Sequence, residues 1–202
     1  MDVDGVLRAE MLSYDSCLIS DALERLGLPP GVAGLARVAT GKRVFGASVT
    51  VKLEAFRGDV PKRHLGTRAI DVAGVGDVIV VEHRQRDDCA GWGGLLSTAA
   101  QRKQISGVVV DGLARDIDES EALGFPIFAR GVTPVTARNR VVETGTNGVV
   151  TIGSVRVEPG DYVLADGSGV AFIPRARLDD VVAAARAMLA FENGIRTALD
   201  QD

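Results

Sequence analysis

Two adjacent charged residues, Arg115 and Asp116, are the strongest candidates for chemistry in this sequence. They closely follow GVVVDG, an apolar run typical of a buried strand. Ligand sites of α/β proteins gather where such strands end. The guanidinium of Arg115 can bind a carboxylate through two parallel hydrogen bonds. The carboxylate of Asp116 can bind a hard divalent cation, Mg²⁺ or Mn²⁺.

Both residues also have a structural alternative. Arg115 can be a surface arginine that pairs with a nearby acid. Asp116 and Glu119, three residues apart, fit the N-cap and its partner in a capping box at the start of a helix. One carboxylate oxygen of Asp116 can serve each role, so local spacing leaves both alternatives open.

A glycine-rich turn, GWGGLL at residues 91–96, precedes a predicted helix. The N–H groups at the start of a helix lack intrahelical partners and carry positive partial charge, so they suit a carboxylate or a phosphate. The alternative is a tight turn between a strand and a helix. The turn lacks the Gly-Lys-Ser/Thr of a P-loop.

His64 is a further candidate, either as a base that reaches a substrate or as an exposed helix residue. It is one of only two histidines, the other being His83, so a histidine-rich zinc site is excluded. A metal would therefore have to be a hard cation on oxygen ligands. The sequence has no G-x-S-x-G nucleophile motif.

The elements that must position these residues alternate along the first two thirds of the chain. Helices are predicted at 16–27, after Pro61, after the glycine turn and from Arg115, and apolar strands at 46–53 and in GVGDVIVVEH, GVVVDG and FPIFARG. Apolar strands alternating with helices indicate a sheet covered on both faces. After Arg130 the sequence is strand upon strand, and the tail from Arg175 reads as a long helix. We expect a single α/β domain over residues 1–202, with a β/β/α layering, a β-rich C-terminal half and a terminal helix.

Composition limits the function further. The chain has 202 residues, 46% of them apolar, and a formal charge of −4, which argues against a general nucleic-acid binder. No apolar run of about 18 residues predicts a transmembrane helix, and the first residues lack the pattern of a signal peptide. With only two cysteines, a disulfide framework is not expected, and we expect a cytoplasmic protein.

Several motifs in order resemble one family. ISDALERLG, GGLLSTAA, GVVVDGLARDIDE, GFPIFARG and VEPGDYVLADGSGVAFIP resemble the RraA-like proteins, which include the regulator of RNase E activity A and the class II 4-hydroxy-4-methyl-2-oxoglutarate aldolases. The resemblance runs from about Cys17 to Pro174, with residues 175–202 as a C-terminal helix. It implies a swivelling β/β/α fold that assembles as a homotrimer or homohexamer, with sites at the subunit interfaces.

The resemblance also implies roles for the candidate residues. Arg115 would hold the carboxylate of pyruvate or of a 2-oxo acid substrate. Asp116 would hold Mg²⁺ or Mn²⁺, directly or through water. The turn before the helix would complete the substrate pocket, through Gly93 and the backbone N–H groups of Gly94, Leu95 and Leu96.

One position departs from the aldolase pattern. The aldolases carry an aspartate 21 places before the arginine, where it orients water and moves a proton, and the matching position here is Gly94. A glycine supplies no acid or base, so another residue or a water would have to move the proton. His64 is our candidate for this catalytic role.

The resemblance therefore implies a metal-dependent lyase that cleaves a 4-hydroxy-2-oxo acid to pyruvate, decarboxylates oxaloacetate, or both. Because of Gly94, two alternatives stay open. One is a non-catalytic regulator that binds an RNase E-like partner. The other is a different lyase or isomerase that acts on a carboxylate substrate.

Overall fold

The computed structural model describes residues 3–58 and 64–199. The helices are α1 (Val3–Ser13), α2 (Ser16–Arg25), α3 (Thr67–Val72), α4 (Gly94–Arg102), α5 (Ile117–Ala122) and α6 (Leu178–Leu199), with a 3-10 turn, η1 (Arg175–Arg177), before α6. The strands are β1 (Ala36–Ala39), β2 (Val44–Ala55), β3 (Val78–Trp92), β4 (Gly107–Ala114), β5 (Ile127–Val132), β6 (Val141–Thr146), β7 (Val150–Ile152), β8 (Val155–Val157), β9 (Tyr162–Ala165) and β10 (Val170–Ile173).

One mixed sheet organises the described chain. Its strands lie in the order β1-β5-β4-β3-β2-β9-β10, and β6 pairs with β2 off this path. The neighbours β2, β3, β4 and β5 run parallel, whereas β1, β6, β9 and β10 join antiparallel. The short hairpin β7–β8 is separate. The predicted alternation of strands and helices is confirmed, and so is the β-rich C-terminal half.

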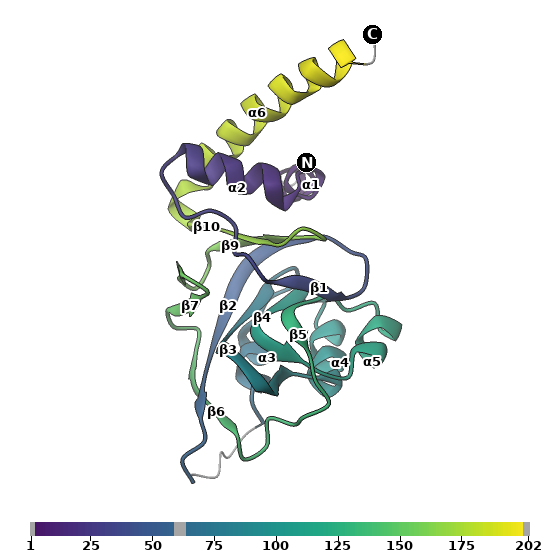
Figure 1. Ribbon diagram of the computed structural model, residues 1–202, viewed down its shortest axis with the longest axis vertical. Helices are drawn as coiled ribbons and strands as arrows, with labels where there is room; N and C mark the ends of the chain where they lie inside the picture. Colours follow the sequence, from purple (N-terminus) through teal and green to yellow (C-terminus); the bar gives the residue numbers. More distant parts are fainter. Residues whose placement is uncertain (1–2, 59–63, 200–202) are drawn as a thin grey trace.

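The apolar parallel strands are buried on both faces. Ile79 and Val110 point to the side of the sheet that α3, α4 and α5 cover, and belong to a cluster with Trp92 and Leu96 (Figure 1). Val80 belongs to the cluster on the opposite side, which includes the β7–β8 hairpin. Successive strand residues thus enter different layers, which explains why the strands are apolar at every position rather than at every second one.

A third apolar cluster joins the two ends of the described chain. Met11 of α1 and Leu23 of α2 pack with Val181 and Ala185 of α6 and with residues of β9 and β10. The second half of α6 extends away from the body (Figure 1), and its Phe191 is 71% exposed. The predicted terminal helix is therefore present, although only its first half contributes to the core.

The structure differs from the sequence-based expectation in four elements. Helix α1 and strand β1 were not predicted. The helix expected after Pro61 begins only at Thr67, and residues 59–63 lie outside the described residues. Strand β3 continues past Glu82 to Trp92 with shifts in its pairing to β4, because polar residues 84–88 interrupt the apolar pattern without ending the strand.

Among the helices of the described chain, none combines the length and apolarity needed to cross a membrane.

Candidate active site at the ends of β3 and β4

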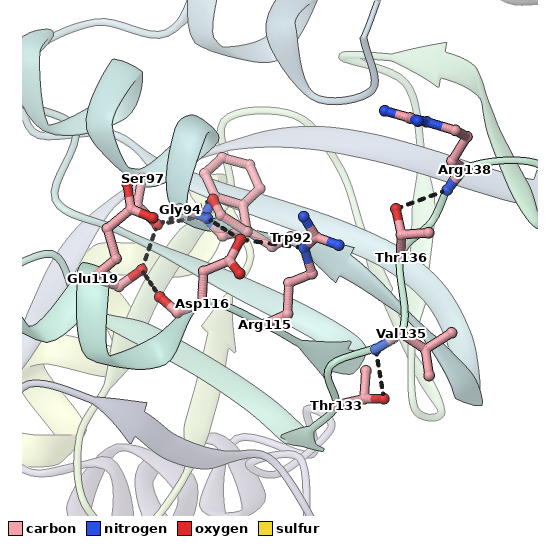
Figure 2. Close-up of polar contacts among 12 residues, drawn as sticks. Trp92, Gly94, Ser97, Arg115, Asp116, Glu119, Thr133, Val135, Thr136 and Arg138 are labelled. Carbon is pink, nitrogen blue, oxygen red and sulfur yellow. Dashed lines mark hydrogen bonds and ion pairs between the residues drawn. The ribbon is translucent and has the colours of Figure 1, made fainter.

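The parallel pairing of β3 and β4 brings the two sequence motifs together. Trp92, the last residue of β3, is the register partner of Ala114, the last residue of β4. The N–H of Arg115 donates to the carbonyl oxygen of Trp92 at 3.0 Å. The turn through Gly93 and the start of α4 therefore lies directly beside Arg115 and its successor (Figure 2). This is the edge of a parallel sheet where ligands bind.

The backbone of Asp116 turns its carboxylate away from its own helix. Asp116 occupies the N-cap position of α5 with φ 56° and ψ 45°, in the left-handed region, and its side chain makes no capping hydrogen bond. Its Oδ2 instead accepts a hydrogen bond from the N–H of Gly94, at 3.0 Å. The capping-box alternative for Asp116 and Glu119 is therefore wrong. An αL residue presents its side chain in a different direction from the extended residue that a capping box requires.

Arg115 lies at the same edge of the sheet, and part of its guanidinium group is free to bind a ligand. Its Nε lies 3.2 Å from Oδ2 of Asp116, and its side chain is 36% exposed. Its two terminal nitrogens have no hydrogen-bond partner within residues 3–58 and 64–199. Figure 2 shows them pointing away from the carboxylate of Asp116. A guanidinium placed in this way can still bind a planar carboxylate.

A series of hydrogen bonds among buried side chains ends on the backbone of Asp116 and holds it in position. The indole Nε1 of Trp92 donates to Oγ of Ser97 at 3.0 Å. The hydroxyls of Ser97 and Ser120 lie 2.8 Å apart, and Ser120 donates to the carbonyl oxygen of Asp116 at 3.2 Å. Both serines are fully buried. Sequence reasoning missed this chain, because nothing in the spacing of two serines on different helices signals that they meet.

Arg115, Asp116 and the turn at the start of α4 line an open cleft of about 410 Å³, a volume that includes its opening to solvent. Its walls are formed by His64, Leu65, Ala90, Gly91, Trp92, Gly93, Gly94, Leu95, Leu96, Arg115, Asp116, Thr136 and Ala137. All the candidate residues named from the sequence thus border one space. Thr136 and Ala137 come from the loop between β5 and β6, which carried no recognisable signal in the sequence.

His64 reaches the cleft from a turn rather than from a helix. It is exposed and lies before α3, whose N-cap is Gly66. Its ring Nδ1 is 3.0 Å from the carbonyl oxygen of Leu65. That carbonyl can only accept, so Nδ1 carries the proton in this contact and Nε2 is left to act as a base. The placement is compatible with the predicted catalytic role, which stays a prediction.

The three backbone N–H groups expected to bind the substrate are not equivalent. Gly94 donates to Asp116, and Leu96 donates to the carbonyl oxygen of Gly93 at 3.1 Å. The N–H of Leu95 has no partner among the residues that the structure describes, and its side chain is 78% exposed. Leu95 therefore offers the amide that is best placed for an incoming anion, while the contribution of Gly94 depends on movement of Asp116.

The donor set fits a hard cation held by few protein ligands. The Oδ1 atom of Asp116 accepts no hydrogen bond from the described residues, and the side chain is 38% exposed at the cleft. Within the described residues no group of three or more His, Cys, Asp or Glu side chains could enclose a metal. Mg²⁺ is commonly held by one or two carboxylates, with waters and substrate oxygens completing its shell. The site fits that mode and not a closed metal cage.

A buried histidine lies behind the cleft wall. His83 is fully buried, and a Cβ atom on Gly112 would lie 2.3 Å from its ring, whereas a Cβ atom on Gly91 would lie 3.0 Å from it. Its Nε2 is 2.9 Å from the carbonyl oxygen of Cys89, so Nε2 carries the proton, and Nδ1 has no partner in the described structure. Burial lowers the pKa of His83 below its ordinary value. The ring is therefore a neutral structural element rather than a catalytic group at the cleft.

Comparison with known proteins identifies the family to which this geometry belongs. Residues 16–172 match the model of the RraA-like family, described as aldolase/RraA. A Halalkalibacterium halodurans protein named "Putative 4-hydroxy-4-methyl-2-oxoglutarate aldolase" is 34% identical over 171 residues, which cover 83% of this chain and 76% of that protein. Protein DlpA of Legionella pneumophila is 31% identical over 193 residues, which cover 96% of this chain but only 31% of DlpA. This chain thus spans about a third of the length of DlpA.

Solved structures agree with this match. An uncharacterized protein from Pseudomonas syringae superimposes with a TM-score of 0.87 at 31% identity, covering 98% of this chain and 93% of that one. Streptomyces coelicolor RraAS2, described as an unusual member of the RNase ES inhibitor RraA protein family, gives 0.86 at 27% identity over 96% of each chain. The expected RraA-like fold is confirmed, as a mixed α/β domain with a long terminal helix. The chain therefore belongs to the RraA-like, aldolase/RraA, family.

Proposed function

We propose that this protein is a divalent-metal-dependent carbon–carbon lyase that cleaves a 4-hydroxy-2-oxo acid to release pyruvate. Oxaloacetate, which yields pyruvate by decarboxylation, is a second substrate of the same chemistry. The observation that carries the proposal is the convergence of Arg115, Asp116 and the start of α4 on one open cleft. The relatives named for aldolase activity support the reaction class.

Each residue has a defined task in this proposal. Arg115 binds the substrate carboxylate through its terminal nitrogens, and the N–H of Leu95 donates to the same group. Their fixed positions hold the substrate with its C3–C4 bond toward the open part of the cleft, which lowers the entropic cost of reaction. The chain Trp92–Ser97–Ser120 keeps the backbone of Asp116 in place.

Asp116 is the protein ligand that we assign to Mg²⁺ or Mn²⁺. When bound, such a cation supplies Lewis-acid polarisation of the 2-oxo group. Asp116 contributes one carboxylate oxygen, while its other oxygen keeps the hydrogen bond to Gly94. The N–H of Gly94 thus orients the carboxylate without competing for Oδ1, which accepts no hydrogen bond from the described residues.

We also propose that the site is completed by a second copy of the chain, in a homotrimer or homohexamer. Two observations support this. The described residues around Asp116 provide too few ligands to enclose a metal. In addition, Leu95 beside the cleft and Val132 at the end of β5 are large apolar residues that are 78% and 57% exposed. Subunit contact would cover such side chains.

A second candidate function is that of a non-catalytic regulator that binds an RNase E-like protein. Two observations favour it: the similarity to Streptomyces coelicolor RraAS2 along nearly the whole chain, and the glycine at the position of the aldolase acid. Against it, a pure interaction surface needs neither the available fork of Arg115 nor the open oxygen of Asp116 beside a cleft. A different lyase or isomerase with a carboxylate substrate would use the same groups.

Pyruvate release tests the proposal directly. Purified protein is incubated with Mg²⁺ or Mn²⁺ and either 4-hydroxy-4-methyl-2-oxoglutarate or oxaloacetate, and pyruvate is coupled to a dehydrogenase. We expect release that Arg115→Ala abolishes and that Arg102→Ala, at the far end of α4, leaves intact. Wild-type release no greater than that of Arg115→Ala would refute the lyase. Capture of an RNase E-like endonuclease by the same preparation would then support the regulator.

A further inference from the structure

Strand β3 is interrupted just before the part of it that borders the cleft. Its register with β4 is regular up to Val81 and shifts repeatedly beyond that residue. Within the interruption, residues 84–88, Arg84 and Gln85 have φ angles of 52° and 56°, in the left-handed region. The end segment of the strand, residues 89–92, comes next, and all of it except its first residue lines the cleft. The contacts that fix this end segment therefore also fix the shape of the cleft.

One side chain bridges the interruption. His83 is the last buried residue before it, and Cys89 is the first buried residue after it. The ring Nε2 of His83 donates to the carbonyl oxygen of Cys89 at 2.9 Å. The ring also lies against Gly91 of the end segment and Gly112 of β4. His83 thus joins the end segment both to the first part of β3 and to the neighbouring strand.

The ring of His83 has a place for one proton only. Nε2 carries that proton, and Nδ1 is buried without a hydrogen-bond partner among residues 3–58 and 64–199. A neutral ring loses only an acceptor contact at Nδ1. A protonated ring would bury both a charge and a donor without an acceptor, which is far more costly. Burial accordingly lowers the pKa of His83 below its ordinary value.

The titratable groups that face the ring do not offset this cost. Arg86 and Asp88, in the interruption, bind one another through hydrogen bonds of 2.8 and 2.6 Å. Asp111 of β4 is already engaged by Nε of Arg130, at 2.6 Å. The thiol of Cys89, 3.9 Å from Nε2, stays neutral because burial raises its pKa. A protonated ring would therefore be more stable in solvent than in its present position.

We propose that His83 is a positioning residue that holds the end segment of β3 in the cleft wall only while its ring is neutral, so that mild acid opens the cleft reversibly. Once protonated, the ring leaves the carbonyl oxygen of Cys89, and the end segment loses its attachment to the first part of the strand. The carbonyl oxygen of Trp92 accepts from the N–H of Arg115, so the displacement reaches the anion-binding residues. The open state should gain up to about tenfold in population per pH unit below about pH 6.5. The switch concerns the shape of the cleft and does not depend on the proposed reaction.

The single tryptophan of the chain reports this opening. Trp92 lies in the end segment and is 2% exposed. His64 borders the same cleft, so the measurement uses His64→Gln, in which His83 is the only histidine left. Between about pH 8 and about pH 5.5, we expect the emission of Trp92 to shift reversibly to longer wavelength, without loss of the far-UV circular dichroism signal. Constant emission would overturn the inference, and so would a shift that accompanies loss of secondary structure.

A second substitution separates His83 from the other titrating groups. In His64→Gln/His83→Gln, the new amide can still donate to the carbonyl oxygen of Cys89 but takes up no proton. The emission of Trp92 should then be independent of pH over the same range. A shift that persists in this double variant would overturn the role of His83.

Proteolysis tests the same opening with the wild-type side chain at position 83. Arg86 lies in the interruption, where its side chain is paired with Asp88 and is 28% exposed. Arg196 lies in the second half of α6, which extends away from the body, and serves as the internal reference (Figure 1). From about pH 7 to about pH 6, trypsin cleavage after Arg86 relative to cleavage after Arg196 should rise by up to about tenfold. A constant ratio would overturn the inference.

These outcomes are distinct from those that test the lyase. Protein that shows the transition of Trp92 but releases no pyruvate would overturn the lyase function alone. Protein that releases pyruvate while the emission of Trp92 stays constant would overturn the role of His83 alone.

Discussion

The hydrogen bond from the N–H of Gly94 to Oδ2 of Asp116, 3.0 Å long, ties the start of α4 to the end of β4. It joins two segments that lie 22 residues apart in the chain. It leaves Oδ1 of Asp116 as the carboxylate oxygen that accepts no hydrogen bond from the described residues. The tie satisfies one of the orphan donors of α4 with a charged acceptor, so it is stronger than a bond to a neutral group.

A single substitution can separate the role of Asp116 in metal binding from its hydrogen bond to Gly94. Asp116→Asn keeps an oxygen that accepts from Gly94 but removes the negative charge that a hard cation requires. We expect little change in the free energy of unfolding, and loss of Mn²⁺ binding in calorimetric titration. Removal of metal with EDTA should abolish pyruvate release from the wild-type protein, and added Mn²⁺ should restore it.

Asp118→Asn is the matched control, because Asp118 is an exposed acid two residues further along the same segment. It should bind Mn²⁺ as the wild-type protein does. Equal Mn²⁺ affinity in Asp116→Asn and the wild-type protein would remove Asp116 from the metal site.

The bidentate hydrogen bonding of the Arg115 guanidinium should contribute more to kcat/KM than its positive charge alone. Arg115→Lys keeps a positive charge but loses the two parallel hydrogen bonds to a carboxylate. We expect kcat/KM to fall by about 10²-fold, in line with the loss of charge-assisted hydrogen bonds worth about 3 kcal/mol. Steady-state kinetics measure this. A lysine variant with wild-type kcat/KM would mean that the substrate carboxylate binds elsewhere.

The hydrogen bonds that link Trp92, Ser97, Ser120 and Asp116 should stabilise one another cooperatively. Ser97→Ala leaves the indole N–H of Trp92 without its acceptor in a buried position, which costs about 1–3 kcal/mol. Urea unfolding of Ser97→Ala, Ser120→Ala and the double variant gives the coupling energy between the two hydroxyls. We expect a double variant that is less destabilised than the sum of the two single changes. Strict additivity would contradict a shared hydrogen bond.

Stability should decline in mild acid because of His83. Burial lowers the pKa of His83 in the folded protein, whereas the unfolded chain binds a proton near pH 6.5. Between these two pKa values the unfolded state binds more protons, so stability falls as the pH drops below about 6.5 and is fully present above it. Urea unfolding across this range measures the slope.

His83→Gln can still donate to the carbonyl oxygen of Cys89, and the slope below about pH 6.5 should become shallower in this variant. An unchanged slope in His83→Gln would refute the assignment.

The sequence by itself determined which segments become strands and helices around the site, and that Arg115 and Asp116 follow a buried strand. Apolar runs such as 107–110 encode this through burial on both faces, which needs no knowledge of neighbours. The pattern also carried the family motifs, and with them the fold. Helix α1 and strand β1 escaped because neither has a clear period of its own, and packing against α6 and β5 decides them.

Only the tertiary structure decided which groups the carboxylates of Asp116 and Glu119 contact. Local spacing made Asp116 and Glu119 a capping pair, because a sequence pattern registers partners three or four residues apart. The pairing of Trp92 with Ala114 placed a different helix end within reach, and both carboxylates turned to it. The absence of side chains at Gly93 and Gly94 is visible in the sequence. What fills that space depends on strand register, which no local pattern specifies.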